Sequence, residues 1–322
     1  MTAGSATPAA TASLVDLPAP AIRVRGLRKV FGSTVAVSGV NLDVPAGAVL
    51  GVLGPNGSGK TTMIRMLLAL SRPTAGTVEL LGAPMPAAAG AVLPHVGALV
   101  EGPGFHPFLS GRENLRRCAA AEPLLSSRAI PDAVEGVLSR VGLASAAGRR
   151  YRAYSLGMKQ RLGLAAALLV PRRLVILDEP TNGLDPAGTR DVRTIIAELH
   201  AGGATVLVSS HLLAEVEATC THVAVLDQGS LIAAGPLAAL LDGGAPALDV
   251  RTPDSAVAMQ ALREAGIGCS IRPTGVRVDL AGTDPPTVVA LLVGAGVAVH
   301  EVQRWRTGLD ELFAQLTEGN SP

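Results

Sequence analysis

One segment of the chain combines glycines with a lysine and a threonine at a spacing that suits phosphate binding. It fits the pattern G-x-x-x-x-G-K-[ST], and its residues are Gly54, Pro55, Asn56, Gly57, Ser58, Gly59, Lys60 and Thr61, followed by Thr62. Glycines let backbone N–H groups curve around a phosphate, because a Cβ would block the approach. Lys60 would neutralise the β- and γ-phosphates, and the Thr61 hydroxyl would bind Mg²⁺. The segment predicts a nucleoside triphosphate site; a glycine-rich turn that matches by chance is the alternative.

Two adjacent carboxylates follow an apolar run farther along the chain. Residues 174–177 read Leu-Val-Ile-Leu, which is typical of a buried strand, and Asp178 and Glu179 come directly after them. Asp178 would hold Mg²⁺ through water, and Glu179 would polarise the attacking water as a general base. An acidic turn after a strand is the alternative interpretation of this pair alone. Together with the first segment, the pair predicts hydrolysis of a nucleotide.

Short apolar runs that alternate with helical patterns must position these two segments. Strand-like runs lie at 48–53, 77–81, 174–178, 205–209, 222–227 and 230–234, and helical patterns lie at 61–70, 110–170, 187–201 and 212–219. Residues 21–45 read as short strands with turns at Arg25-Gly26 and at Phe31-Gly32-Ser33. Strands that alternate with helices predict an α/β fold with a mostly parallel sheet and helices on both faces.

The last quarter of the chain predicts a separate small α+β module. After a linker-like stretch at 242–246, strands are expected at 247–252, 268–272, 275–280 and 297–303, and helices at 255–265 and 285–295. A final helix, 308–317, begins with a capping-box pattern, and its apolar face would pack on the module. We therefore expect a disordered tail at 1–20, a nucleotide-binding domain at 21–241 with a helical subdomain at about 102–170, and an accessory part at 242–322.

The composition excludes several classes of protein. Lys and Arg total 27 and Asp and Glu total 26, so the net charge of +1 offers no electrostatic basis for bulk binding of nucleic acid. The three cysteines are far apart in sequence, which argues against a disulfide framework and fits a reducing cytosol. Since no run reaches the ~18 apolar residues of a spanning helix, we expect a cytoplasmic chain that meets a membrane only through a partner.

A third segment identifies a family. Residues 154–161 read Tyr-Ser-Leu-Gly-Met-Lys-Gln-Arg and resemble the signature loop of the ATP-binding cassette (ABC) family, usually written LSGGQ. Residues 180–186 resemble the D-loop of that family, and residues 208–211, which end in His211, resemble its switch histidine. These segments, in this order, extend the resemblance over roughly residues 22–240. It implies a P-loop NTPase fold, with a RecA-like sheet and a helical signature subdomain, that uses ATP and Mg²⁺.

The resemblance also implies how two copies share their nucleotides. Each ATP would lie between Lys60 of one copy and Ser155 and Gly157 of the other, in a head-to-tail homodimer or with a paired cassette. Asp185 of the D-loop would join this site, and His211 would contact the γ-phosphate. A histidine at a strand end with only a structural role is the alternative for His211.

Residues 28–32 resemble the aromatic loop that stacks on adenine, with Phe31 in place of the commoner Tyr. Val37 would pack against the sugar or base, and a core aromatic is the alternative for Phe31.

Where the family usually has a metal-binding Gln, this chain has Glu101. A carboxylate can bind Mg²⁺, but when ionised it cannot donate a hydrogen bond to the attacking water. Glu101 and the YSLGM-type signature resemble the subgroup of bacitracin-resistance exporters.

The resemblance implies a motor that powers a separate membrane permease from the inner face of the plasma membrane. The subgroup favours export of a drug, an antibiotic or a lipid-like molecule. The face around residues 101–115, with the apolar loop Phe105, His106, Pro107 and Phe108, would meet the permease, or else belongs to the core. One alternative is a soluble ABC ATPase that acts on ribosomes or DNA, although such relatives usually carry two cassettes or long basic linkers. The other is a non-catalytic scaffold, which the intact Lys60, Asp178 and Glu179 argue against.

Overall fold

A six-stranded sheet lies at the centre of the computed structural model, which describes residues 19–100, 104–241 and 246–305. Its strands are β3 (Val49–Leu53), β6 (Val96–Leu99), β7 (Leu174–Asp178), β8 (Thr205–Ser210), β9 (His222–Asp227) and β10 (Ser230–Pro236). They lie in the order β10-β9-β3-β8-β7-β6, and all the pairings are parallel except that of β10 with β9. Every residue of β3, β7 and β8 is buried, as expected for parallel strands covered on both faces. The predicted mostly parallel sheet is confirmed.

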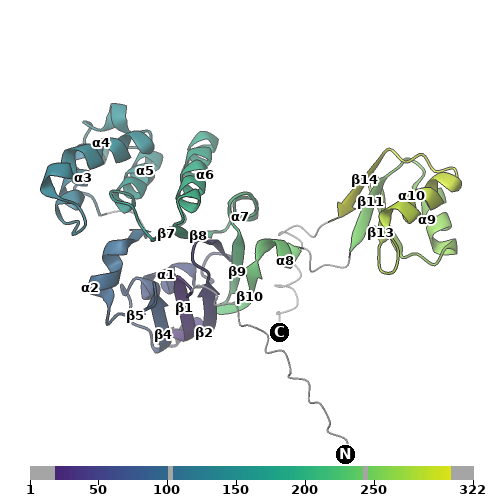
Figure 1. The fold of residues 1–322 in the computed structure, drawn as a ribbon, viewed down its shortest axis with the longest axis horizontal. Helices are drawn as coiled ribbons and strands as arrows, with labels where there is room; N and C mark the ends of the chain where they lie inside the picture. The colour runs from purple at the N-terminus through teal and green to yellow at the C-terminus, as the bar shows by residue number, and fades with distance from the viewer. Residues whose placement is uncertain (1–18, 101–103, 242–245, 306–322) are drawn as a thin grey trace, which may run out of the picture.

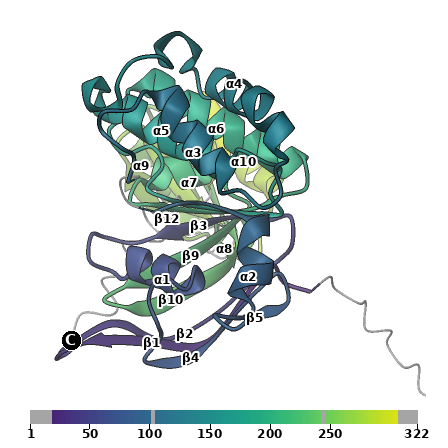
Figure 2. The same cartoon turned by 90° about the vertical axis from the view of Figure 1, so that its left-hand side faces the viewer.

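The central sheet is covered by a group of helices on one face and by a helix and an antiparallel sheet on the other (Figures 1 and 2). Alternate residues of its strands enter two different apolar cores. Val49 and Leu53 of β3 face the core shared with α3 (Gly111–Ala120), α4 (Ile130–Arg140), α5 (Leu156–Ala167), α6 (Pro186–Ala201) and α7 (Leu213–Thr219). Leu50 and Val52 face the core shared with α1 (Lys60–Leu67) and an antiparallel sheet. The period of two along a strand produces this division. The sheet is therefore fixed from both sides, and the loops at the carboxyl ends of its strands have a rigid base.

The antiparallel sheet is formed by β1 (Ile22–Phe31), β2 (Thr34–Val44), β4 (Ala75–Leu80) and β5 (Ala83–Met85) in the order β2-β1-β4-β5. The hairpin between β1 and β2 turns at Gly32-Ser33, as predicted. The turn predicted at Arg25-Gly26 is wrong, because β1 continues through it with a register shift between Val24 and Leu27. Gly26 has φ +55°, and its N–H donates to Asn41 Oδ1 at 2.8 Å. A glycine and an extra residue in one strand produce a bulge here rather than a turn.

The stretch predicted as helical at 110–170 contains α3, α4 and α5, joined by short 3₁₀ turns. A buried guanidinium ties these helices to the central sheet. Arg172 pairs with Glu122 Oε2 at 2.6 Å and also donates to the carbonyls of Pro94 and Ala167. Because both side chains of this pair are almost fully buried, the helical part has a fixed attachment beside β6 and β7. The short helices α2 (Ala89–Val92) and α8 (Leu237–Leu241) complete this larger part of the chain.

Residues 246–305 form the separate module drawn in yellow-green in Figure 1. Its elements are β11 (Ala247–Arg251), α9 (Ser255–Glu264), β12 (Cys269–Arg272), β13 (Gly275–Asp279), α10 (Pro285–Gly294) and β14 (Glu301–Trp305). The antiparallel sheet has the order β12-β13-β11-β14, a split β-α-β arrangement. The strand predicted at 297–303 begins later, because Val297 is buried in the core and Ala298 N–H donates to Asp254 at the connection.

Several predictions fall on residues that the structure does not describe. The final helix at 308–317 lies outside the described residues, as do Glu101, residues 242–245 of the expected linker and residues 1–18 of the expected tail. Among the described helices, none is both long enough and apolar enough to cross a membrane.

Candidate nucleotide site

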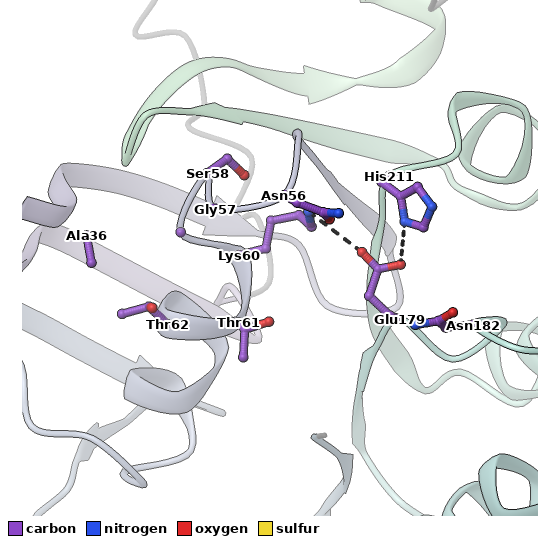
Figure 3. Close-up of a pocket in the computed structure, with 11 residues that line it drawn as sticks. Ala36, Asn56, Gly57, Ser58, Lys60, Thr61, Thr62, Glu179, Asn182 and His211 are labelled. Atoms are coloured by element: carbon purple, nitrogen blue, oxygen red, sulfur yellow. Dashed lines mark hydrogen bonds and ion pairs between the residues drawn. The ribbon is translucent and has the colours of Figure 1, made fainter. Parts of the chain in front are cut away.

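The phosphate-binding pattern forms a loop between β3 and α1, beside a cavity of about 440 Å³ (Figure 3). Two glycines are required by its geometry. A Cβ on Gly54 (φ +156°) would lie 2.3 Å from the Leu226 carbonyl oxygen, and one on Gly59 (φ +102°) would lie 2.5 Å from that of Ala36. The cavity is lined by Ala36, Asn56, Gly57, Ser58, Gly59, Lys60, Thr61, Thr62, Glu179, Asn182 and His211. The loop therefore presents backbone N–H groups and the first turn of α1 to one space, as an anion site requires.

Lys60 lies at the base of this loop with a side chain that is only 6% exposed. Its Nζ donates to the carbonyls of Gly54 at 2.7 Å and Pro55 at 3.2 Å, and lies 3.6 Å from Glu179 Oε1. Gly54 and Pro55 thus hold the lysine rather than line the cavity. The Ser58 hydroxyl is buried and has no hydrogen-bond partner within the part of the chain that the structure describes. A buried cation and an unpaired donor beside glycine N–H groups fit a polyphosphate.

Thr61, Asp178 and Ser209 form a second polar cluster next to the lysine. Thr61 Oγ1 donates to Asp178 Oδ2 at 2.8 Å, and Ser209 Oγ donates to Asp178 Oδ1. Asp178 is buried at the carboxyl end of β7, and Ser209 comes from the neighbouring strand β8. A hydroxyl and a carboxylate beside this cavity are oxygen ligands of the kind that Mg²⁺ prefers, so the residues fit this ion. The sequence patterns pointed to Thr61 and Asp178 but not to Ser209.

Glu179 directs its carboxylate into the cavity between two nitrogen groups, as Figure 3 shows. Its Oε2 is 2.9 Å from His211 Nδ1, and its Oε1 is 3.6 Å from Lys60 Nζ. Its backbone has φ +47°, which is unusual for a residue with a side chain. Glu179 and His211, predicted from separate segments, are therefore brought together at the carboxyl ends of β7 and β8.

The signature residues do not line this cavity within a single chain. Ser155 is exposed and caps the N-terminus of α5, where its Oγ accepts from Met158 N at 3.2 Å. A Cβ on Gly157 would lie 3.2 Å from the Leu184 side chain, so this loop packs beside residues 183–184. Asp185 caps α6 by accepting from Gly188 N at 2.8 Å, and it does not line the cavity either. Asn182, which the sequence patterns did not single out, does.

The two residues expected near the base and sugar have different surroundings. Phe31 is 52% exposed, with Lys29 Nζ 4.8 Å from its ring centroid, so it is not a core aromatic. Val37 is fully buried in the core that contains α1. The predicted contact of Val37 with the sugar or base is therefore wrong for this structure, because its side chain faces inward along β2. The preceding residue, Ala36, lines the cavity instead.

Comparisons with known proteins agree with this geometry. The model of the ABC transporter family matches residues 37–182. The bacitracin transport ATP-binding protein BcrA of Enterococcus faecalis is 42% identical over 212 residues, which cover 66% of this chain and 68% of BcrA. The daunorubicin resistance ATP-binding protein DrrA3 of Streptomyces coeruleorubidus is 38% identical over 316 residues, which cover 92% of this chain and 96% of DrrA3.

Among solved structures, the fold is similar to that of the ATP-binding cassette MJ0796, described as a dimeric post-hydrolysis state bound to ADP and Pi. The TM-score is 0.62 at 22% identity, and the match covers 67% of this chain and 98% of the other. The chain belongs to the ABC transporter family, as an ATP-binding and ATP-hydrolysing subunit.

Proposed function

We propose that this chain is the ATPase subunit of an exporter and drives a separate permease at the inner face of the plasma membrane. Two relatives support export of a drug-like or antibiotic substrate: one is named for bacitracin transport and the other for daunorubicin resistance. DrrA3 matches almost over its full length, so the likeness includes the C-terminal module. A chain whose described helices cannot cross a membrane would need such a partner to act on transport.

The observation that supports hydrolysis best is the position of the Glu179 carboxylate. It lies at the cavity between Lys60 Nζ and His211 Nδ1. In our proposal, Glu179 accepts a proton from the attacking water, and Lys60 stabilises negative charge that develops on the transferred phosphoryl group. His211 orients the Glu179 carboxylate through their hydrogen bond and contacts the γ-phosphate. Thr61 and Asp178 would hold Mg²⁺, which supplies charge neutralisation of the phosphates when bound.

We also propose that two copies of the chain share their ATP sites. Ser155 caps the N-terminus of the twelve-residue helix α5, whose positive end is exposed and does not line the cavity of its own chain. Such a helix end suits an anion, and the anion that a second copy offers is the triphosphate on its own loop. Each complete site would then contain Lys60 of one copy and Ser155 of the other. Asp185, as the cap of α6, would lie close to the surface where the two copies meet.

Ser155→Arg should abolish hydrolysis while ATP still binds to the single chain. The long side chain removes the cap of α5 and fills the space that the partner's triphosphate must occupy, but the cavity around Lys60 is unchanged. Calorimetry measures ATP binding, and phosphate release measures turnover. Ser126→Arg, at an exposed serine in the helical part, is the matched control and should hydrolyse ATP normally.

Mixing Ser155→Arg with Lys60→Ala tests the sharing of sites directly. In a mixed dimer, the intact lysine of one variant faces the intact serine of the other, so one of the two sites is complete. The mixture should recover up to half of the activity of wild-type dimers, although each variant alone is inactive. A mixture that stays as inactive as its components would contradict the composite site.

Purification from gently solubilised membranes should recover this chain together with a polytopic membrane protein. The expectation follows from the exporter proposal, and mass spectrometry of the tagged chain would identify the partner. Recovery with ribosomal RNA or DNA, removed by nuclease, would support the soluble ATPase alternative instead. The test is specific because the net charge of +1 gives the chain little general attraction for nucleic acid.

A further inference from the structure

The backbone of Glu179 adopts a conformation that its surroundings must maintain. Its φ of +47° lies in the left-handed region, which side chains with a Cβ disfavour. Such a conformation persists only where neighbouring groups determine it. At this position it directs the carboxylate toward Lys60 and His211, away from the line of β7. The groups that hold the two peptide bonds of Glu179 therefore also control the direction of the carboxylate.

Two side chains from different elements hold these peptide bonds. The N–H of Glu179 donates to Ser209 Oγ at 2.9 Å. The carbonyl oxygen accepts from Gln160 Nε2 at 3.0 Å and from the backbone N–H of Asn182 at 3.1 Å. Ser209 also contacts Asp178, so a change at Ser209 would disturb the expected metal site. Gln160 lies on α5 and donates to the Glu179 carbonyl. A substitution at Gln160 therefore tests the Glu179 backbone without changing the contact between Ser209 and Asp178.

Gln160 lies on the same helix as Ser155, about one and a half turns farther along at 3.6 residues per turn. Its partner residue lies 19 positions away in sequence, so the hydrogen bond joins the signature helix to the end of β7. We propose that Gln160 is a positioning residue: its amide fixes the backbone of Glu179 and so links the signature helix to the general base of the same chain. This inference rests on the proposed role of Glu179.

In the proposed dimer, this link has a direct consequence. The N-terminus of α5 serves the ATP of the partner copy, whereas Glu179 serves the ATP of its own chain. A displacement of α5 when the partner's triphosphate binds would carry the Gln160 amide with it. The Glu179 carboxylate would then be aligned in one site according to the state of the other site. The hydrogen bond of 3.0 Å from Gln160 Nε2 to the Glu179 carbonyl is the contact that would carry this displacement.

Gln160→Met tests the role by removing the donor while keeping the length of the side chain. We expect kcat of the full-length chain to fall about tenfold, the effect of losing one well-placed hydrogen bond. KM and the ATP affinity measured by calorimetry should stay unchanged, because Gln160 does not line the cavity. Turnover is measured at protein concentrations high enough that the rate per subunit no longer rises with concentration. Gln260→Met, on the exposed face of α9, is the matched control and should behave like wild type.

Gln160→Glu adds a pH profile that a merely structural role would not produce. An ionised carboxylate cannot donate to the Glu179 carbonyl, whereas a protonated one can. Relative to wild type, the activity of Gln160→Glu should therefore rise as the pH is lowered from 7 to 5, toward the ordinary glutamate pKa of about 4.3. The deficit of Gln160→Met should stay constant over the same range. This second variant is isosteric with glutamine, so it keeps the test valid where the methionine disturbs folding.

The outcomes separate this inference from the proposed function. If Gln160→Met turns over ATP like wild type while Glu179→Gln does not, the positioning role is overturned and the general base stands. A parallel loss of ATP affinity, or a deficit of Gln160→Glu that does not change with pH, would also overturn the positioning role. If Glu179→Gln itself retains wild-type turnover, the proposed general base fails, and the inference about Gln160 fails with it.

Discussion

Glu179→Gln should bind ATP at least as tightly as the wild type and hydrolyse it about 10²- to 10⁴-fold more slowly, the usual contribution of a general base. The amide has the shape of the carboxylate, so the cavity and the contact with His211 Nδ1 are preserved. It cannot accept a proton from water at neutral pH, because an amide oxygen is a far weaker base than a carboxylate. Phosphate release under saturating ATP measures the loss, and calorimetry measures the binding that should remain.

The same variant should accumulate as a dimer in the presence of ATP and Mg²⁺. If two copies share their triphosphates, a site that binds but does not hydrolyse keeps the copies together, and size-exclusion chromatography detects the change in mass. Replacing the Glu179 carboxylate with a neutral amide also removes the negative charge 3.6 Å from Lys60 Nζ, which frees the ammonium for phosphate. Both effects favour the ATP-bound dimer.

Glu198→Gln is the matched control for Glu179→Gln. Glu198 lies on α6, is more than half exposed and pairs with Arg140 at 2.9 Å. An exposed pair of this kind contributes little to stability, so turnover of the control should match that of wild type. Turnover of Glu179→Gln close to wild type would count against the general base and would direct attention to His211 or to a water held by the phosphates.

The parts of the site that are contiguous in sequence could be predicted closely. Gly54, Gly59 and Lys60 act through one loop whose conformation depends on local sterics, and Asp178 ends a strand that its apolar neighbours define. In such segments, the residue types and the local backbone determine the geometry. The predicted strand 174–178 agrees with the structure at both ends, because its five consecutive residues are buried in the middle of the sheet.

The parts of the site that depend on distant neighbours could not be predicted. Ser209 and Gln160 lie 30 and 19 residues from Glu179, and they meet it only because β7, β8 and α5 pack together. Their types carry no signal, since serine and glutamine are common on strand ends and helices. Val37 shows the same limit of sequence-based prediction, because the direction of its side chain depends on distant neighbours. A strand residue next to a cavity points either in or out, and the register of β2 decides which.

The fold shows how a local signal can be overridden by tertiary structure. Arg25-Gly26 looks like a turn, but pairing of β1 with both β2 and β4 keeps the strand continuous and converts the glycine into a bulge. Asp185 looks like a nucleotide ligand by its place in a D-loop pattern, yet in the single chain its carboxylate is used as the cap of α6. In the first case the hydrogen bonds are satisfied by strands that are distant in sequence, and in the second by the first turn of the helix that follows Asp185.

Lys60→Ala should weaken ATP binding about 100-fold, which corresponds to about 2.7 kcal/mol, within the range for losing a buried charge-assisted contact. The ammonium is almost fully buried and lies beside the loop whose N–H groups face the cavity. Without it, the charge of the triphosphate is opposed only by backbone dipoles, and the nearby Glu179 carboxylate repels the ligand. Calorimetry at constant ionic strength measures the change, because screening by salt would otherwise reduce it.

Lys60→Arg should not restore this affinity, although it keeps the positive charge. The Lys60 ammonium donates to two carbonyls of its own loop, at 2.7 and 3.2 Å, and a planar guanidinium cannot occupy that compact position without moving the loop. Lys159→Ala is the control, because it removes a positive charge from a side chain that lies over the Tyr151 ring and outside the cavity. If Lys60→Ala and Lys159→Ala bound ATP equally well, the triphosphate would have to lie elsewhere than against the glycine loop. If Lys60→Arg alone recovered affinity, charge rather than the fit of the ammonium to the loop would determine binding.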